Sequence, residues 1–259
     1  NDNVYLSDDE PHDIRYFDGL GRLSQRVLYK ASPDTSKSIV SLIEYYNLSS
    51  IAKQWLPASM NNGTTMAKYR DTSAVKTSSR ATNNNDQKPF SYSQYDNTPL
   101  NRLTKHYGAG EVWQNPEVDK FTGTDRYSNE ATGFLSCNHY SVTTSGELSK
   151  NGTYAAGKLH VVKTTDEDGN VLYEFSNIIG QLLLSRSINA GVSNDTYHVY
   201  DLKGNLTYVL SPMASSALSS DGTWSADNQT ILDFCYRYEY DGRNRMIEKK
   251  LPGCEQYSR

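Results

Sequence analysis

The chain has 259 residues and a formal net charge of −4, with 36% apolar and 22% charged residues. No stretch approaches the roughly 18 consecutive apolar residues that a membrane-spanning helix needs, and the composition lacks the Ala, Glu, Lys and Leu excess of a coiled coil. Its 20 tyrosines and 6 phenylalanines are too many for a disordered polar chain. They favour pleated strands with solvated faces.

Charge and cysteine content exclude two further classes. The acidic balance gives no basic footprint, so we expect neither a nucleic-acid partner nor direct insertion into a membrane. Cys137, Cys235 and Cys254 contain no CxxC pair and cannot form a disulfide framework. One bridge between Cys235 and Cys254 and a set of free thiols both remain open.

The first residues, Asn1-Asp2-Asn3, include neither a starting Met nor a charged-then-apolar leader. We therefore expect a segment of a larger protein whose signal peptide is not in this segment.

A short pattern recurs along the chain. An extended run ends in an aromatic or β-branched residue and is followed by Asp or Asn, two variable residues, Gly or a substitute, a polar residue and an aliphatic one. In chain order the copies begin at Asp18, Asn47, Asp166, Asn177, Asp201 and Asp241, and the copy at Asn47 is the weakest.

The spacing predicts a β-hairpin at each copy. An Asp or Asn side chain accepts a hydrogen bond from a backbone N–H two residues on and closes an Asx turn. Three residues after it the chain reverses at positive φ, where Gly, or Asn with little strain, is favoured. The predicted structural turn residues are Asp18, Gly21, Asp166, Gly169, Asn177, Gly180, Asp201, Gly204, Asp241 and Asn244.

Insertions separate the copies. Residues 59–89 are rich in Ser, Thr and Asn and predict a long polar surface loop, with a short helix starting at Met66–Arg70. Residues 114–133 and 211–229 predict two further irregular stretches. Residues 158–253 hold the most regular repeats. No linker divides the chain, so residues 1–259 are predicted to form a single all-β region of antiparallel hairpins and meanders in one curved or spiralling sheet.

The sequence carries no catalytic signature, cofactor fingerprint or metal-binding motif, so we expect no enzyme, no cofactor and no metal. Cys137 and His139 would share one face of a strand, which makes a nucleophile or metal pair conceivable, but no second ligand pair lies nearby. Asp166-Glu167-Asp168-Gly169-Asn170 resembles the start of a calcium loop, yet the closing Glu would fall at Asn177. A hairpin turn explains that segment better.

The tyrosine content permits two interpretations. Sugars stack on aromatic rings while their hydroxyls meet polar neighbours, and Trp55, Trp113 and Trp224 lie in or beside irregular segments, where recognition residues often sit. Alternating tyrosines also form cross-strand aromatic pairs with no ligand at all. The sequence favours the second interpretation and identifies no binding residue.

The repeat resembles the YD repeat of bacterial Rhs and wall-associated proteins, with Tyr-Asp at Tyr95-Asp96, Tyr200-Asp201 and Tyr240-Asp241. Residues 15–23, followed by Ile43-Glu44-Tyr45-Tyr46 and Trp55-Leu56-Pro57, look like the segment that opens the repeat array in a secreted or surface branch of that family. The resemblance covers roughly residues 12 to 253.

The resemblance implies long antiparallel strands wound side by side, which in relatives enclose a C-terminal cargo, often a toxin. It implies a non-catalytic scaffold or shell segment of a secreted or cell-surface bacterial protein, whose partners are the remaining repeats and the C-terminal domain of the parent chain. The alternative is a carbohydrate-binding module at the cell surface. A chain with so few repeats would form at most part of a shell wall.

Overall fold

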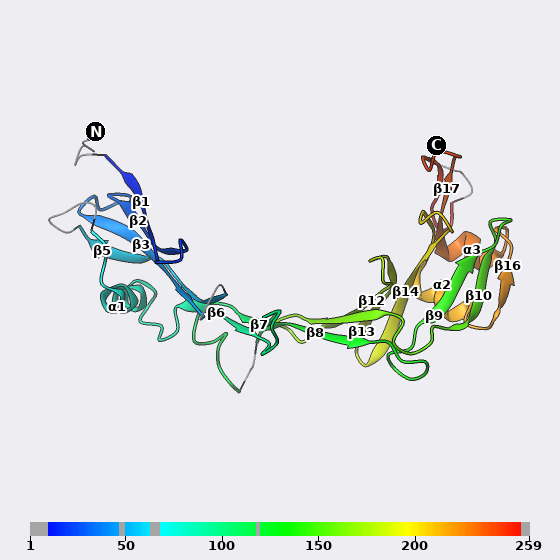
Figure 1. Cartoon of the computed structure of the whole chain (residues 1–259), viewed down its shortest axis with the longest axis horizontal. Coiled ribbons are helices and arrows are strands. Elements are labelled where there is room, and N and C mark those ends of the chain that lie inside the picture. The colour runs from blue at the N-terminus through cyan, green and yellow to red at the C-terminus, as the bar shows by residue number, and fades with distance from the viewer. Residues whose placement is uncertain (1–9, 47–49, 63–67, 118–119, 255–259) are drawn as a thin grey trace. The chain divides into compact units, whose positions relative to one another are not determined.

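The computed structural model describes residues 10–46, 50–62, 68–117 and 120–254, and strands predominate among them (Figure 1). Their pairings are antiparallel, which confirms the predicted all-β class. The chain divides into two compact units, Asn1–Gly123 and Thr124–Arg259. No change of composition marks this division, and the idea that residues 1–259 form one repeat region of a longer protein stays a prediction.

The first unit is a sheet in the order β1-β2-β3-β4-β6-β7, with β5 paired to β3. Strand β8 (Thr122–Ser128) spans the division, and its first two residues pair with β7. The elements of the first unit are β1 (His12–Phe17), β2 (Leu23–Tyr29), β3 (Lys37–Tyr45), β4 (Ile51–Trp55), β5 (Ala58–Asn61), α1 (Thr72–Thr82), β6 (Phe90–Tyr95) and β7 (Leu103–Tyr107).

Buried and partly exposed residues alternate along β3, and the buried ones contribute to the core of this unit. Val40 and Leu42 are buried on one face, and Val75 of α1 is fully buried in the same apolar cluster. Trp55 belongs to this cluster too, packed at 4.7 Å between ring centroids against Phe90, so it is a core residue and not an exposed recognition residue.

The predicted loop at 59–89 is wrong in part, because it contains β5 and α1. Met66 and Ala67 lie outside the described residues, and the helix begins at Thr72 instead of within 66–70. Asp71 caps it by accepting a hydrogen bond from the N–H of Ala74 at 2.9 Å. The predicted irregular stretch 114–133 likewise contains β8, a strand whose polar composition hides it.

In the second unit the main sheet runs β8-β11-β12-β13-β14-β15-β17-β18, and a small sheet runs β16-β10-β9. Residues 158–253, predicted to be the most regular, contain all the strands of the main sheet after β8. The elements are β9 (Asn138–Val142), β10 (Leu148–Thr153), β11 (His160–Thr165), β12 (Val171–Ser176), β13 (Leu182–Asn189), β14 (Val192–Tyr200), β15 (Leu206–Leu210), α2 (Pro212–Ala217), β16 (Gly222–Trp224), α3 (Gln229–Phe234), β17 (Cys235–Tyr240) and β18 (Met246–Lys250).

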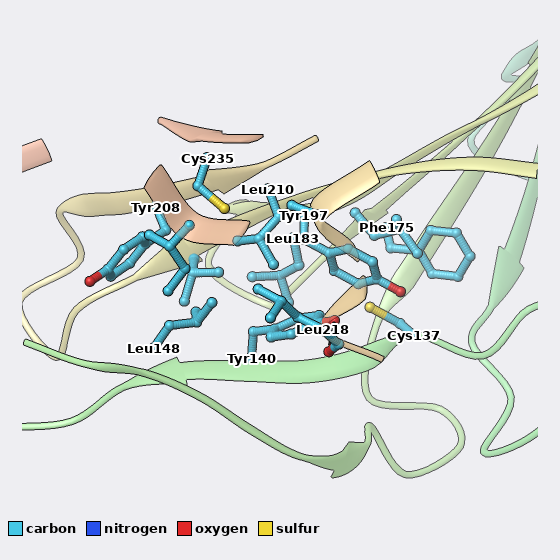
Figure 2. Close-up of a cluster of buried hydrophobic side chains, with 14 of the residues drawn as sticks. Cys137, Tyr140, Leu148, Phe175, Leu183, Tyr197, Tyr208, Leu210, Leu218 and Cys235 are labelled. Atoms are coloured by element: carbon cyan, nitrogen blue, oxygen red, sulfur yellow. Dashed lines mark hydrogen bonds between the residues drawn. The ribbon is translucent and has the colours of Figure 1, made fainter. Parts of the chain in front are cut away.

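The core of the second unit lies between the two sheets and the short helices. Figure 2 shows Tyr140 and Leu148 of the small sheet facing Phe175, Tyr208 and Leu210 of the main sheet. A hydrogen bond from the Tyr140 hydroxyl to the Leu218 carbonyl, at 3.0 Å, satisfies a polar atom inside this cluster.

One charged side chain enters the same core. Arg186 is buried and forms a bidentate pair with Asp195, at 2.7 and 2.6 Å, with the rings of Phe134 and Phe175 within 5.6 Å of its guanidinium carbon. A paired, sandwiched guanidinium is a stable way to bury a charge. Among the described residues no helix is long and apolar enough to cross a membrane.

Candidate functional site

The turn that Asp18 opens has the geometry its spacing predicts. Asp18 Oδ1 accepts hydrogen bonds from the N–H groups of Leu20 and Arg22, at 2.9 and 3.0 Å. The N–H of Gly21 donates to the Asp18 carbonyl at 3.0 Å, and Gly21 has φ +75°. This is a type I turn followed by a left-handed residue, the common loop of a hairpin with a bulge.

The same arrangement recurs at Asp166, Asn177, Asp201 and Asp241, whose Oδ1 atoms each accept from the N–H groups two and four residues later. The left-handed residues are Gly169 at φ +82°, Gly180 at +84°, Gly204 at +87° and Asn244 at +60°. We call these five loops the Asx turns: residues 18–22, 166–170, 177–181, 201–205 and 241–245. Asn47, which begins the weakest sequence copy, lies outside the described residues.

Two related turns escape the sequence pattern. In the loop 96–102, Asp96 Oδ1 accepts from the N–H of Arg102 at 2.9 Å, across two more residues than in an Asx turn. In the loop 143–147, the Thr143 hydroxyl replaces the carboxylate and accepts from the N–H of Glu147 at 3.0 Å. The Tyr95-Asp96 pair is the signal that identifies the first of these.

The fifth residue of each Asx turn completes it. Arg22 Nε donates to Asp18 Oδ2 at 2.7 Å, and Arg245 Nε does the same to Asp241 Oδ2. Asn170 and Asn205 donate to Asp166 and Asp201 at 2.8 and 2.9 Å.

The turn at 177–181 reverses the donor. Asn177 Nδ2 donates to Gln181 Oε1 at 2.7 Å. The polar residue after the Gly is thus an acceptor when the turn opens with Asn and a donor when it opens with Asp.

Neighbouring Asx turns are joined along one end of the second unit's sheet. Gln181 Nε2 donates to the Gly204 carbonyl at 3.4 Å, and Asn205 Nδ2 donates to Asn244 Oδ1 at 3.2 Å. The turns 177–181, 201–205 and 241–245 therefore form a hydrogen-bonded row.

A tyrosine that is the last residue of the incoming strand joins each of three hairpins to the one before it. The hydroxyls of Tyr45, Tyr95 and Tyr240 donate to the backbone carbonyls of Leu23, Ile51 and Leu206, at 2.9, 3.1 and 2.9 Å. In each case the acceptor is the first residue of the neighbouring strand after its own turn. We call these contacts inter-hairpin bonds.

Tyr200 occupies the equivalent place beside Leu182 by strand register, but its hydroxyl has no hydrogen-bond partner among the described residues. Tyr200 can therefore serve as a control for substitutions that remove an inter-hairpin bond.

The turn carboxylates are electrostatically stabilised in their ionised form. Hydrogen bonds from the backbone and guanidinium of Arg22 lower the pKa of Asp18, and those from Arg245 lower the pKa of Asp241. Burial raises the pKa of Asp96, but hydrogen bonds from Thr98 and Arg102 outweigh it and lower the value to about 2.

The residues singled out for chemistry are not brought together. Burial raises the pKa of Cys137 to about 12, and its thiol contacts the Asn138 carbonyl, whereas His139 packs on the ring of Tyr154 at 4.5 Å. All three cysteines are free, with Cys235 buried and Cys254 exposed, and the two buried sulfur atoms lie well apart in Figure 2. In the part of the chain that the structure describes, no cluster of three His, Cys, Asp or Glu residues is placed to hold a metal.

A pocket of about 740 Å³ lies beside the turn 96–102 in the first unit. Its lining includes the rings of Tyr46, Tyr92 and Tyr95, with the Tyr46 and Tyr92 hydroxyls 3.0 Å apart. Burial and the bond to Tyr92 raise the pKa of Tyr46 to about 12, which keeps this hydroxyl neutral. A smaller cavity of about 240 Å³ shares Tyr92 and Gln94 with it. We call the larger cavity the tyrosine pocket.

Polar side chains complete the tyrosine pocket. Gln94 and Asn97 have no side-chain hydrogen-bond partner among the described residues, so their amides are available to a ligand. Asp96 is the one carboxylate among the described lining residues. The Thr98 hydroxyl and the Arg102 guanidinium donate hydrogen bonds to it.

Comparison with known protein families finds one match, which covers the first part of the chain. Residues 3–128 match the family model described as a domain of unknown function (DUF6443). The match takes in the first structural unit and ends at Ser128, the last residue of β8. None of the curated proteins matches the chain.

Proposed function

We propose that this chain is a non-catalytic structural segment of YD-repeat type, belonging to a larger secreted or cell-surface bacterial protein in which it scaffolds an attached domain. The observation that carries the proposal is the inter-hairpin bond, repeated in both units at Tyr45, Tyr95 and Tyr240. These residues stabilise the sheet through the backbone of the neighbouring hairpin. The recurring residues of the repeat thereby contribute to architecture.

The test is made on the native polypeptide. Its intact mass in the source cells, together with lysine cross-linking and mass spectrometry, identifies what lies beyond and against residues 1–259. We expect a much longer chain with cross-links from this segment to a different domain of the same polypeptide. A native chain that ends near Arg259 and cross-links to no attached domain contradicts the scaffold.

Carbohydrate binding is a second candidate, and the tyrosine pocket is the observation that favours it. Its volume lies in the range of about 300–1,000 Å³ that is usual for ligand sites. Tyr rings offer flat apolar faces to sugar C–H groups, while the amides of Gln94 and Asn97 both donate and accept, as sugar hydroxyls do. A neutral oligosaccharide matches this lining.

Titration with neutral oligosaccharides tests the second candidate, followed by NMR shifts of the pocket residues. Asn97→Ala removes an exposed amide without a partner, so it should weaken binding at least several-fold while the melting temperature stays unchanged. Tyr236→Ala, at an exposed tyrosine of β17 outside the tyrosine pocket, is the control. Binding that survives Asn97→Ala, Gln94→Ala and Tyr46→Ala alike, or no binding across a broad glycan array, rejects the pocket.

A further inference from the structure

The tyrosine pocket is the first of three adjoining cavities in the first unit. The cavity of about 240 Å³ shares Tyr92 and Gln94 with it. A third cavity, of about 570 Å³, shares Lys88, Asn115 and Pro116 with the second one. Together the three exceed the range of about 300–1,000 Å³ that a single small ligand usually fills. We call this row of cavities the extended groove.

Aromatic side chains follow the first two cavities of the extended groove. The rings of Tyr46 and Tyr95 meet edge to face, with their centroids 6.0 Å apart. The ring of Tyr92 in β6 stacks on that of Tyr107 in β7, also at 6.0 Å between centroids. Because Tyr92 lines both cavities and Tyr107 lines the second, aromatic contacts are offered along a length of the groove.

The third cavity is lined by amides in place of rings. We call it the asparagine pocket, formed by residues 83–86, 111–112 and 115–116 with Lys88. Asn84 and Asn85 lie just beyond helix α1, and their side-chain amides have no hydrogen-bond partner among the described residues. Val112 is 74% exposed, and Pro116 is exposed as well. Available amides and apolar groups therefore line the same cavity.

Hydrogen bonds hold the two loops that form the asparagine pocket. The Asp86 carboxylate accepts from the N–H groups of Lys88 and Glu111, at 2.7 and 3.0 Å. The N–H of Gly110 donates to the Lys88 carbonyl at 2.9 Å, and the Lys88 ammonium donates to the Gln114 carbonyl at 2.8 Å. These bonds join the loop after α1 to the loop after β7, so little ordering is left for a ligand to impose.

We propose that the extended groove binds a glycan chain of several units that contains N-acetylated amino sugars, with one acetamido group in the asparagine pocket. An acetamido group has an N–H donor, a carbonyl acceptor and a methyl group. The amides of Asn84 and Asn85 match its polar atoms, and the apolar surface of Val112 matches its methyl. The inference rests on the carbohydrate-binding candidate and specifies the class of glycan.

An extended peptide is the competing occupant, because proline-rich segments also bind in aromatic-lined grooves. The backbone of such a segment offers mainly carbonyl acceptors, since proline has no N–H. The amides of Gln94, Asn84 and Asn85 each carry an acceptor as well as donors, and these atoms have no partner among the described residues. Hydroxyl and acetamido groups satisfy both kinds of atom, so the groove favours a glycan.

Calorimetric titration of the full chain tests the proposal with hexamers of N-acetylglucosamine, glucose and glucosamine that share one linkage. The N-acetylglucosamine dimer is the fourth probe, and a proline-rich peptide is the fifth. The hexamers differ only in the group at one ring carbon, whereas the dimer differs from its hexamer only in length. The set therefore separates the effect of the acetamido group from the effect of chain length.

The N-acetylglucosamine hexamer should bind most tightly of the five probes. We expect it to bind at least about tenfold more tightly than its dimer, because linked contacts raise the effective concentration at each subsite. It should bind about five- to tenfold more tightly than the glucose hexamer, the effect of one or two net hydrogen bonds.

The variant Asn85→Gly locates the acetamido group. Asn85 has φ +58°, which glycine adopts without strain, so this substitution removes the amide and keeps the backbone. The variant should bind the N-acetylglucosamine and glucose hexamers with nearly equal affinity. Asn244→Gly is the matched control, the same change at φ +60° in the second unit, and it should leave both affinities as they are.

Equal affinity for dimer and hexamer overturns the extended groove. Equal affinity for the glucose hexamer, or tighter binding of the glucosamine hexamer, overturns the acetamido assignment, as does a preference that survives both Asn84→Gly and Asn85→Gly. Tighter binding of the peptide overturns the glycan class. Sugar binding that Asn97→Ala weakens, but that depends neither on length nor on the acetamido group, rejects this inference while the tyrosine pocket stands as a sugar site.

Discussion

The hydroxyl of Tyr240 lies 2.9 Å from the carbonyl oxygen of Leu206, and this contact joins β17 to the strand of the preceding hairpin. The carbonyl lies just beyond a turn that the Asp201 side chain holds in shape, and the tyrosine lies just before the turn of Asp241. The Tyr-Asp pair thus combines two functions in adjacent residues. Tyr secures its hairpin to a neighbour, and Asp closes its own turn.

Removing the Tyr240 hydroxyl should cost about 0.5–1.5 kcal/mol of unfolding free energy, the net value of one intramolecular hydrogen bond. Urea unfolding of Tyr240→Phe measures it. Tyr200→Phe is the matched control, since its hydroxyl has no partner among the described residues, and it should stay within about 0.5 kcal/mol of the parent. Equal losses in both variants would contradict the structural importance of the inter-hairpin bond.

Gly204→Val should destabilise the second unit by about 1–3 kcal/mol, because Gly204 has φ +87° and a β-branched residue is strained there. Gly242→Val is the control, since Gly242 lies in the turn 241–245 outside the positive-φ set and a Cβ there meets open space. Thermal melts of both variants test this. An unchanged melting temperature for Gly204→Val would show that the left-handed conformation is not required.

The donor reversal in the turn 177–181 predicts an energetic coupling. In the variant Gln181→Arg, the guanidinium would face the Asn177 Nδ2 group, so two hydrogen-bond donors would meet. The Asn177 amide cannot rotate to present its oxygen, because Oδ1 already accepts hydrogen bonds from two backbone N–H groups. Asn177→Asp should restore the match, with a coupling of about 1 kcal/mol in a double-mutant cycle. Asn170→Arg, placed opposite Asp166, reproduces the pairing at Asp18 and should be nearly neutral. Simple additivity of the two changes at 177 and 181 would disprove the matching rule.

Acid should weaken the turns that open with Asp. Their pKa values are lower in the folded chain than in the unfolded one, so the stability they contribute is complete above the unfolded value of about 3.9 and is lost as pH falls through the folded value. For Asp96 that window extends down to about 2. Carboxyl ¹³C shifts followed from pH 6 to pH 1.5 measure each titration.

The variant Asp96→Asn should flatten the dependence of the melting temperature on pH across this window. The turn that opens with Asn177 has no carboxylate and serves as the internal reference. A folded-state midpoint near 3.9 for Asp96 would contradict the hydrogen-bonded arrangement described for it.

The Asx turns could be predicted from the sequence because their hydrogen bonds are local. Asp18 and Gly21 act on backbone atoms within the same five residues, so their spacing alone predicts the turn. Helix α1 is harder to recognise, because its sequence is rich in Ser and Thr and only Val75 and Ser79 are buried. Asp71, at the position before it, was the available signal for its start.

The inter-hairpin bonds depend on pairing across strands, and no spacing in the chain contains that information. Tyr95 and Ile51 are separated by β5 and α1, and only the adjacency of β4 and β6 brings them together. The tyrosine pocket is hidden for the same reason, since Tyr46 and Tyr92 meet through this strand pairing. Division of the chain after Gly123 leaves no compositional trace either.

Every inter-hairpin bond has a backbone carbonyl as its acceptor, and a backbone carbonyl is present whatever the residue. Leu23, Ile51 and Leu206 are therefore free to be replaced by other side chains without loss of the contact. A gene duplication that copies one such hairpin carries the tyrosine with it and needs no particular side chain as acceptor in the neighbouring hairpin. Arrays of this kind can lengthen, shorten and diverge with no need for paired compensating mutations.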